Sequence, residues 1–203
     1  MHVLRVALCA AVFLLPSVLP AQTRVGIALG RSLVGSGGSR VPISAGSTNV
    51  LTGAGRPGWF GAVQVEAPIS ASAFSFRGEL SVSRLGRDEQ AISAVPGSTP
   101  LPTAAFDRSI GLSASLVAAT SRSARLAPYA VMGIGLYAAT LRGGPLNGTG
   151  GFEASGNGLG IQLGAGLRYR VGRANVLLES RLVQPMSNVR GTNYLPLTLG
   201  VQF

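Results

Sequence analysis

The sequence is poor in the residues that most often carry chemistry or crosslink a fold. It has 203 residues, with one cysteine, Cys9, one histidine, His2, and no lysine. Both single residues lie near the N-terminus, in a stretch typical of an export signal. Without them, a chain has no disulfide and no thiolate or imidazole for metal binding or for acid–base catalysis near neutral pH. The sequence therefore predicts no metal, no cofactor and no catalytic residues.

Long hydrophobic runs are also missing. Beyond the N-terminal stretch, no apolar run reaches the ~18 residues that indicate a membrane-spanning helix. The mean hydropathy is nevertheless positive, at +0.38. Hydrophobicity that is spread in alternation rather than in blocks is typical of a membrane β-barrel.

The N-terminal stretch has the layout of a secretory signal peptide. Arg5 precedes the apolar run from Val6 to Leu15, and Ala21 ends a segment with two prolines. The run is too short to span a bilayer. We expect residues 1–21 to be a signal peptide and residues 22–203 to form one domain.

The charge of the exported part is strongly positive. Of 17 basic residues, Arg5 leaves with the signal, so 16 arginines stand against 7 carboxylates. Such a balance invites a nucleic-acid interpretation. However, the arginines are scattered through strands and loops, with no basic helix, no run and no aromatic platform beside them. We expect no nucleic acid as partner, and note that the phosphates of lipopolysaccharide are anions an exported protein can meet.

Eight segments alternate apolar and polar or small side chains, as strands do. They are Arg24–Leu33, Gly58–Ala67, Ala73–Arg84, Arg108–Ala118, Pro128–Leu141, Asn157–Val171, Asn175–Gln184 and Tyr194–Phe203. The connections alternate between long and short, with loops expected over 34–57, 85–107 and 142–156. Strands of about ten residues, even in number, fit a closed transmembrane barrel. The alternation fails at Gly61 and Gly78, where we expect bends or bulges.

Aromatic residues near the strand ends suggest the girdles that membrane proteins place at the lipid interface. The expected girdle residues are Trp59, Phe74, Tyr129, Tyr169, Tyr194 and Phe203.

The last strand ends on an aromatic residue, Phe203, after strict alternation from Tyr194. Together with the export signal, the loop pattern and the segment Pro128-Tyr-Ala-Val-Met-Gly-Ile-Gly135, this resembles the OmpA/OmpX-like outer-membrane β-barrels. The resemblance implies an all-β, eight-stranded antiparallel up-and-down barrel in the bacterial outer membrane. It also implies that Phe203 is the signal recognised by the barrel-assembly machinery. We expect no peptidoglycan-binding domain after the barrel, and we expect a monomer.

Charged residues fall on the face that should point into the lumen. They are Glu66, Arg77, Glu79, Arg168, Glu179 and Arg181. An unpaired charge in a narrow interior is costly, so we expect a polar network. Register counting from the tight turns pairs Glu66 with Arg77 and Glu179 with Arg168, each diagonally on neighbouring strands. Small inward residues such as Gly135 and Gly164 are expected to leave space for water.

Two tempting signals for chemistry are weak. Gly133-Ile-Gly135-Leu-Tyr-Ala138 fits a dinucleotide-binding fingerprint, but the strand alternation continues through it, so no helix begins there. The lumen carboxylates have arginines to neutralise them, which disfavours an acid–base pair. Barrel enzymes of this size resemble the chain in fold but rely on histidine, so we expect no enzyme.

The sequence thus predicts an outer-membrane barrel with a structural or surface-interaction role through its external loops. Its partners would be outer-membrane lipid and lipopolysaccharide. A small diffusion channel is the alternative. An exported lipid-binding barrel, which would carry its apolar face inward, is less favoured.

Overall fold

The structure is a computed structural model that describes residues 23–34, 40–43, 48–69, 73–89, 105–121, 124–145, 151–187 and 193–203. The predicted signal peptide, with His2 and Cys9, lies outside these ranges. The regular structure within them consists of β-strands. Across the described ranges, no helix is long and apolar enough to cross a membrane.

The strands follow one another along the chain in a simple order. They are β1 (Arg24–Val34), β2 (Arg40–Ile43), β3 (Thr48–Pro68), β4 (Phe74–Glu89), β5 (Ala105–Ala119), β6 (Leu126–Pro145), β7 (Gly151–Val171), β8 (Ala174–Ser187) and β9 (Tyr194–Gln202).

Pairing between the first and last strands closes the sheet. Consecutive strands from β3 to β9 pair antiparallel, and β1 pairs with both β3 and β9. This makes an eight-stranded barrel of β1 and β3 to β9, which confirms the predicted fold. At the seam, the Val25 N–H donates to the Phe203 carbonyl at 3.1 Å and the Phe203 N–H donates to the Val25 carbonyl at 2.8 Å. A closed ladder leaves no open edge in the membrane.

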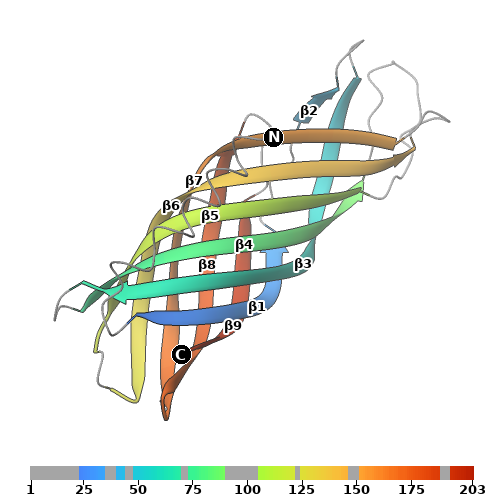
Figure 1. Cartoon of the computed structure of the whole chain (residues 1–203). Coiled ribbons are helices and arrows are strands. Elements are labelled where there is room, and N and C mark those ends of the chain that lie inside the picture. The colour runs from blue at the N-terminus through green and yellow to red at the C-terminus, as the bar shows by residue number, and fades with distance from the viewer. Residues whose placement is uncertain are drawn as a thin grey trace.

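The two ends of the barrel differ. One end of the barrel, called the turn end here, carries the short connections from β3 to β4, from β5 to β6 and from β7 to β8. β1 begins and β9 ends at the same end. Gly172 opens the two-residue turn between β7 and β8 with a φ of 60°, which favours glycine. The loop end carries the connections after β1, β4, β6 and β8. There β2 pairs with the beginning of β3 as a hairpin, near the upper right of Figure 1.

A belt of apolar side chains surrounds the barrel. Every barrel strand contributes to it, for example through Ile27, Val63, Leu80, Leu112, Ile134, Leu163, Leu182 and Leu199. Residues of the opposite parity point inward and are mostly buried. A continuous outward apolar belt is unfavourable in water and is required in lipid. The barrel therefore spans a membrane.

The strands extend further at the loop end than the sequence predicts. Loops were expected over 34–57 and 142–156, but β3 begins at Thr48, β6 continues to Pro145 and β7 begins at Gly151. These segments are rich in small and polar residues and lack an apolar period. Backbone groups alone make the ladder, so a strand can continue beyond the lipid without alternation.

The predicted bulges at Gly61 and Gly78 are wrong, because β3 and β4 pair in unbroken register at both positions. The register shifts nearer the loop end, including between Arg56 and Trp59. Pro57 lies in this interval and has no backbone N–H to offer the ladder. Gly58 lies in the same interval, and an added Cβ there would clash with the Arg84 carbonyl. The second shift, between Thr52 and Gly55, contains no proline.

Four of the six predicted girdle residues point outward: Trp59, Phe74, Tyr169 and Phe203. Tyr129 and Tyr194 are buried inside the barrel, so the girdle prediction is wrong for these two. Tyr129 shares its strand face with the buried Val131, and Tyr194 shares its face with the buried Thr198. Parity along the strand decides the direction of a ring, not its nearness to a strand end.

We expect Leu163→Arg to lower the free energy of unfolding by about 2–4 kcal/mol, the cost of a guanidinium at the bilayer midplane. Leu163 is 61% exposed and central among the outward apolar residues of β7. The matched control is Leu126→Arg, also outward but at the turn end of β6, with an expected loss of about 0–1 kcal/mol. Urea unfolding can be followed through Trp59, the only tryptophan. Equal losses would contradict the position of the belt.

Candidate functional site: a charged network in the lumen

The six charged residues predicted for the lumen are all buried inside the barrel. They come from four strands: Glu66 from β3, Arg77 and Glu79 from β4, Arg168 from β7, and Glu179 and Arg181 from β8. Their direction follows from the strand period of two, which sends the apolar neighbours of each into the lipid.

Glu66 accepts hydrogen bonds from arginines on two walls of the barrel. Arg77 lies directly opposite Glu66 in the register of β3 and β4, and its Nη2 donates to Glu66 Oε2 at 3.1 Å. Arg168 Nη2 donates to Glu66 Oε1 at 2.7 Å and to Oε2 at 2.9 Å. In the closed strand order, β7 lies diametrically across from β3. The Arg168 contact therefore crosses the lumen.

Two further contacts cross between β4 and β8, which also lie on opposite walls. Arg77 Nη1 donates to Glu179 Oε2 at 2.5 Å, and Arg181 Nη1 donates to Glu79 Oε1 at 2.9 Å. On β8 itself, Arg181 Nε lies 2.7 Å from Glu179 Oε1. The three pairs that cross the lumen share one spacing, 102 residues along the chain.

Opposite charges are balanced within this network, because three carboxylates meet three guanidinium groups. Ions buried away from water are tolerated only when they are paired and hydrogen-bonded. Each of the six ions makes at least one ion pair, and three of the pairs tie opposite walls together. Glu79 Oε2 and the Nε atoms of the three arginines make no hydrogen bond.

The predicted partners are only partly right. Glu66 does contact Arg77, but it lies directly opposite Arg77 and not diagonally. Arg168 lies two positions from the partner of Glu179 in the β7–β8 register, as predicted, but it contacts Glu66 across the lumen. Counting the register from the turns relates only residues on neighbouring strands. In an eight-stranded barrel the interior is narrow enough for long side chains to reach the far wall.

Neutral residues that the sequence analysis did not assign to the network complete it. The Tyr129 hydroxyl donates to Glu179 Oε2 at 2.7 Å, and the guanidinium carbons of Arg77 and Arg168 each lie 5.5 Å from its ring centroid. Gln162 Oε1 accepts from Arg181 Nη1 at 3.2 Å. The inward parity of these residues is a signal in the sequence. Their contacts are not, because the partners lie on strands far apart in the chain.

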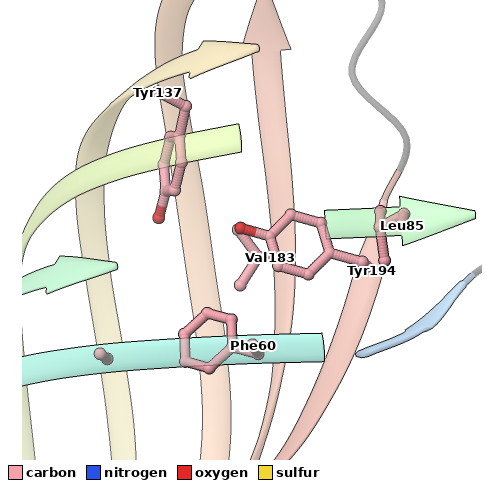
Figure 2. Close-up of a cluster of buried hydrophobic side chains, with 6 residues drawn as sticks. Phe60, Leu85, Tyr137, Val183 and Tyr194 are labelled. Carbon is pink, nitrogen blue, oxygen red and sulfur yellow. The ribbon is translucent and has the colours of Figure 1, made fainter. Parts of the chain in front are cut away.

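Apolar clusters lie on both sides of the charged network. The loop-end cluster consists of Phe60, Ala62, Leu85, Tyr137, Val183 and Tyr194. Figure 2 shows the side chains of Phe60, Tyr137 and Tyr194 pointing toward a common space between the strands. The Arg181 guanidinium lies 5.5 Å from the Phe60 ring, so this cluster adjoins the network. The turn-end cluster consists of Val117, Ala119, Tyr129, Val131 and Leu177.

Inward glycines make room for large neighbours. A Cβ added at Gly160 would lie 2.7 Å from the Tyr137 ring, and one at Gly166 would lie 2.5 Å from the Tyr129 ring. At Gly135 and Gly164, which were expected to leave space for water, an added Cβ would meet Ser113 and Arg181 side chains. That expectation is wrong at these positions, because neighbouring side chains fill the space.

The remaining predicted residues have plain structural places. Phe203 is 72% exposed and pairs through its backbone with Val25, while its predicted role in assembly stays a prediction. Gly133–Ala138 lies within β6, so it does not form the strand-to-helix turn of a dinucleotide site. Among the described residues, no group of three or more His, Cys, Asp or Glu side chains is placed to hold a metal.

We expect Glu179→Gln to destabilise the barrel by about 3–5 kcal/mol, because it leaves buried arginine charge uncompensated. Glu179 contacts both Arg77 and Arg181, so no other single carboxylate replaces it. Adding Arg77→Met restores the charge balance. The loss in the double variant should therefore be smaller than the sum of the single losses, as measured by urea unfolding. Additive losses would show that the pair is not coupled.

Comparisons with known proteins show a shared fold without a shared sequence. No protein-family model and no curated protein matches the chain. A major outer membrane protein from Thermus thermophilus is 14% identical with a TM-score of 0.55, over 89% of this chain and 98% of that one. Neisserial surface protein A is 16% identical (TM-score 0.49, 89% and 94% covered), and Ail of Yersinia pestis is 14% identical (TM-score 0.46, 89% and 99% covered). Together with the closed ladder and the outward apolar belt, the Thermus likeness establishes the fold as that of the eight-stranded β-barrels of bacterial outer membranes.

Proposed function

We propose that the protein is a closed structural barrel that presents its loop end to the cell exterior for surface contacts. The observation that carries this proposal is the set of three ion pairs across the lumen, from β3 to β7 and from β4 to β8. With opposite walls tied together and apolar clusters on both sides, the lumen has the character of a packed core. An eight-stranded barrel leaves an interior just wide enough for side chains to fill it.

The length of the strands supports a role at the loop end. β3 and β7 have 21 residues each and β6 has 20. A tilted strand crosses the hydrocarbon region with about 9–11 residues. On β3, Trp59 is the outward apolar residue nearest the loop end among the side chains that the structure describes in the belt, and residues 48–58 extend the strand past it. Paired strands are stiffer than loops, so they carry the connections away from the membrane surface as a rigid rim.

A diffusion channel is the alternative that the lumen disfavours, because a pore needs a continuous polar path. An exported lipid-binding barrel is disfavoured by the direction of its side chains, since the apolar residues face outward and the charges inward. Our proposal includes no catalytic step, because Glu66, Glu79 and Glu179 are each held by arginine. It takes the protein to be a monomer surrounded by outer-membrane lipid, with no nucleic-acid partner.

The purified protein should give no stable unitary currents in a planar bilayer, because the crossing ion pairs and the aromatic rings block the lumen. A variant that shortens Arg77, Glu179, Phe60 and Tyr194 to alanine removes one crossing pair and part of the loop-end cluster. This variant should show measurable conductance if it inserts. Reproducible open events in the unaltered protein would contradict the structural role and favour the channel.

Cysteine labelling in whole cells tests the orientation. The only native cysteine, Cys9, lies in the predicted signal peptide, so a single introduced cysteine is a clean reporter. Ser155→Cys is exposed near the loop end of β7, and Arg173→Cys is its exposed control in the turn between β7 and β8. A membrane-impermeant maleimide should label the first variant in intact cells and the second only after the outer membrane is opened. The reverse pattern would overturn the proposal.

A further inference from the structure

A row of polar and cationic side chains runs around part of the outer surface, from β1 to β6. Arg31 pairs in register with Trp59, Trp59 with Arg84, Arg84 with Arg108, and Arg108 with Thr140. Since each of these residues shares the parity of the outward apolar positions on its strand, the row lies on the membrane-facing side of the barrel.

This row marks a defined depth. On β4 the outward residue next toward the turn end is Val82, and on β5 it is Ile110. On these two strands the apolar belt ends where the arginines begin, whereas on β1 the exposed Leu33 lies beyond Arg31. That boundary is where lipid headgroups meet acyl chains, and tryptophan is enriched there in membrane proteins.

The row opens into a cavity of about 340 Å³ that is lined by Trp59, Arg84, Arg108, Thr140 and Arg142. Three guanidinium groups thus share one surface cavity. Arg84 and Arg108 lie directly opposite each other on neighbouring strands, so their guanidinium groups reach the cavity from adjacent positions.

We propose that this cavity binds the phosphate groups of a phosphorylated lipid headgroup in the membrane leaflet at the loop end. Guanidinium groups present two N–H donors in a plane that matches a phosphate, and the Thr140 hydroxyl adds a further donor. The adjoining belt accommodates the acyl chains of the same molecule, which a free phosphate lacks. The Trp59 ring, half exposed beside the cavity, can pack against the headgroup.

This inference rests on the proposed function, in which the loop end faces the cell exterior. In that orientation the cavity lies in the outer leaflet. There the phosphorylated lipid would be lipopolysaccharide. Binding to the purified protein in detergent does not depend on orientation. The two proposals can therefore fail separately.

Native mass spectrometry of the full-length protein with bisphosphorylated lipid A tests the cavity, with the dephosphorylated lipid as reference. The unaltered protein should prefer the phosphorylated form. Arg84→Gln with Arg108→Gln should weaken that binding by about tenfold or more, because two charge-assisted contacts are lost. The control is Arg125→Gln with Arg173→Gln at the turn end, which changes the net charge equally and should leave binding within about twofold, since neither residue lines the cavity.

Three outcomes would overturn the proposal. One is equal binding of the two lipids by the unaltered protein, a result that needs no variant to fold. Another is equal weakening by both pairs of substitutions, which would show attraction to net charge alone. The third is displacement of lipid A by an equal concentration of inorganic pyrophosphate, which would assign the cavity to a soluble phosphate. Slower migration on gels after boiling verifies that each variant is a folded barrel before binding is measured.

Discussion

The structure depends on one constraint, the pairing of every backbone polar group where no water is available. In lipid, an unpaired N–H or C=O costs several kcal/mol, so a sheet must close on itself. Here closure is made by β1, which pairs with β3 on one side and β9 on the other, down to the bonds between Val25 and Phe203. The period of two then fixes which side chains meet lipid and which meet the lumen.

Closure with eight strands also sets the width of the interior. This width explains which side chains contact one another in the lumen. Polar and charged residues that alternate with the apolar belt are forced inward, where they must find partners. Because the far wall is within reach of a long side chain, Glu66 meets Arg168 and Arg77 meets Glu179 across the lumen. Tyr129 and Tyr137 occupy room left by glycines on neighbouring strands. The result is an interior with ion pairs at its centre and one apolar cluster on either side, among further inward polar residues such as Gln202 and Asp107.

Arginines on the outer surface have different surroundings from those in the lumen. Inside the barrel, Arg77, Arg168 and Arg181 meet carboxylates of the same chain. On the outside, Arg84 and Arg108 lie opposite each other on neighbouring strands, next to the outward Val82 and Ile110. The same residue type therefore serves internal closure in one place and, in our proposal, lipid recognition in the other. The balanced network accounts for three arginines and three carboxylates, so the chain's excess of arginine over acidic residues lies outside it.

The amino-acid order alone was enough to predict the eight strands, their facing and the membrane location, because lipid imposes a strict alternation that can be read directly. It also identified the six lumen charges by parity. Which charges pair became clear only in the folded barrel, since the crossing pairs lie 102 residues apart and on strands that share no ladder. The same holds for the extension of β3, β6 and β7 at the loop end, where backbone pairing continues without an apolar pattern. The row of polar and cationic side chains on the outer surface also depends on the tertiary structure. The register of five strands aligns residues that are scattered along the chain.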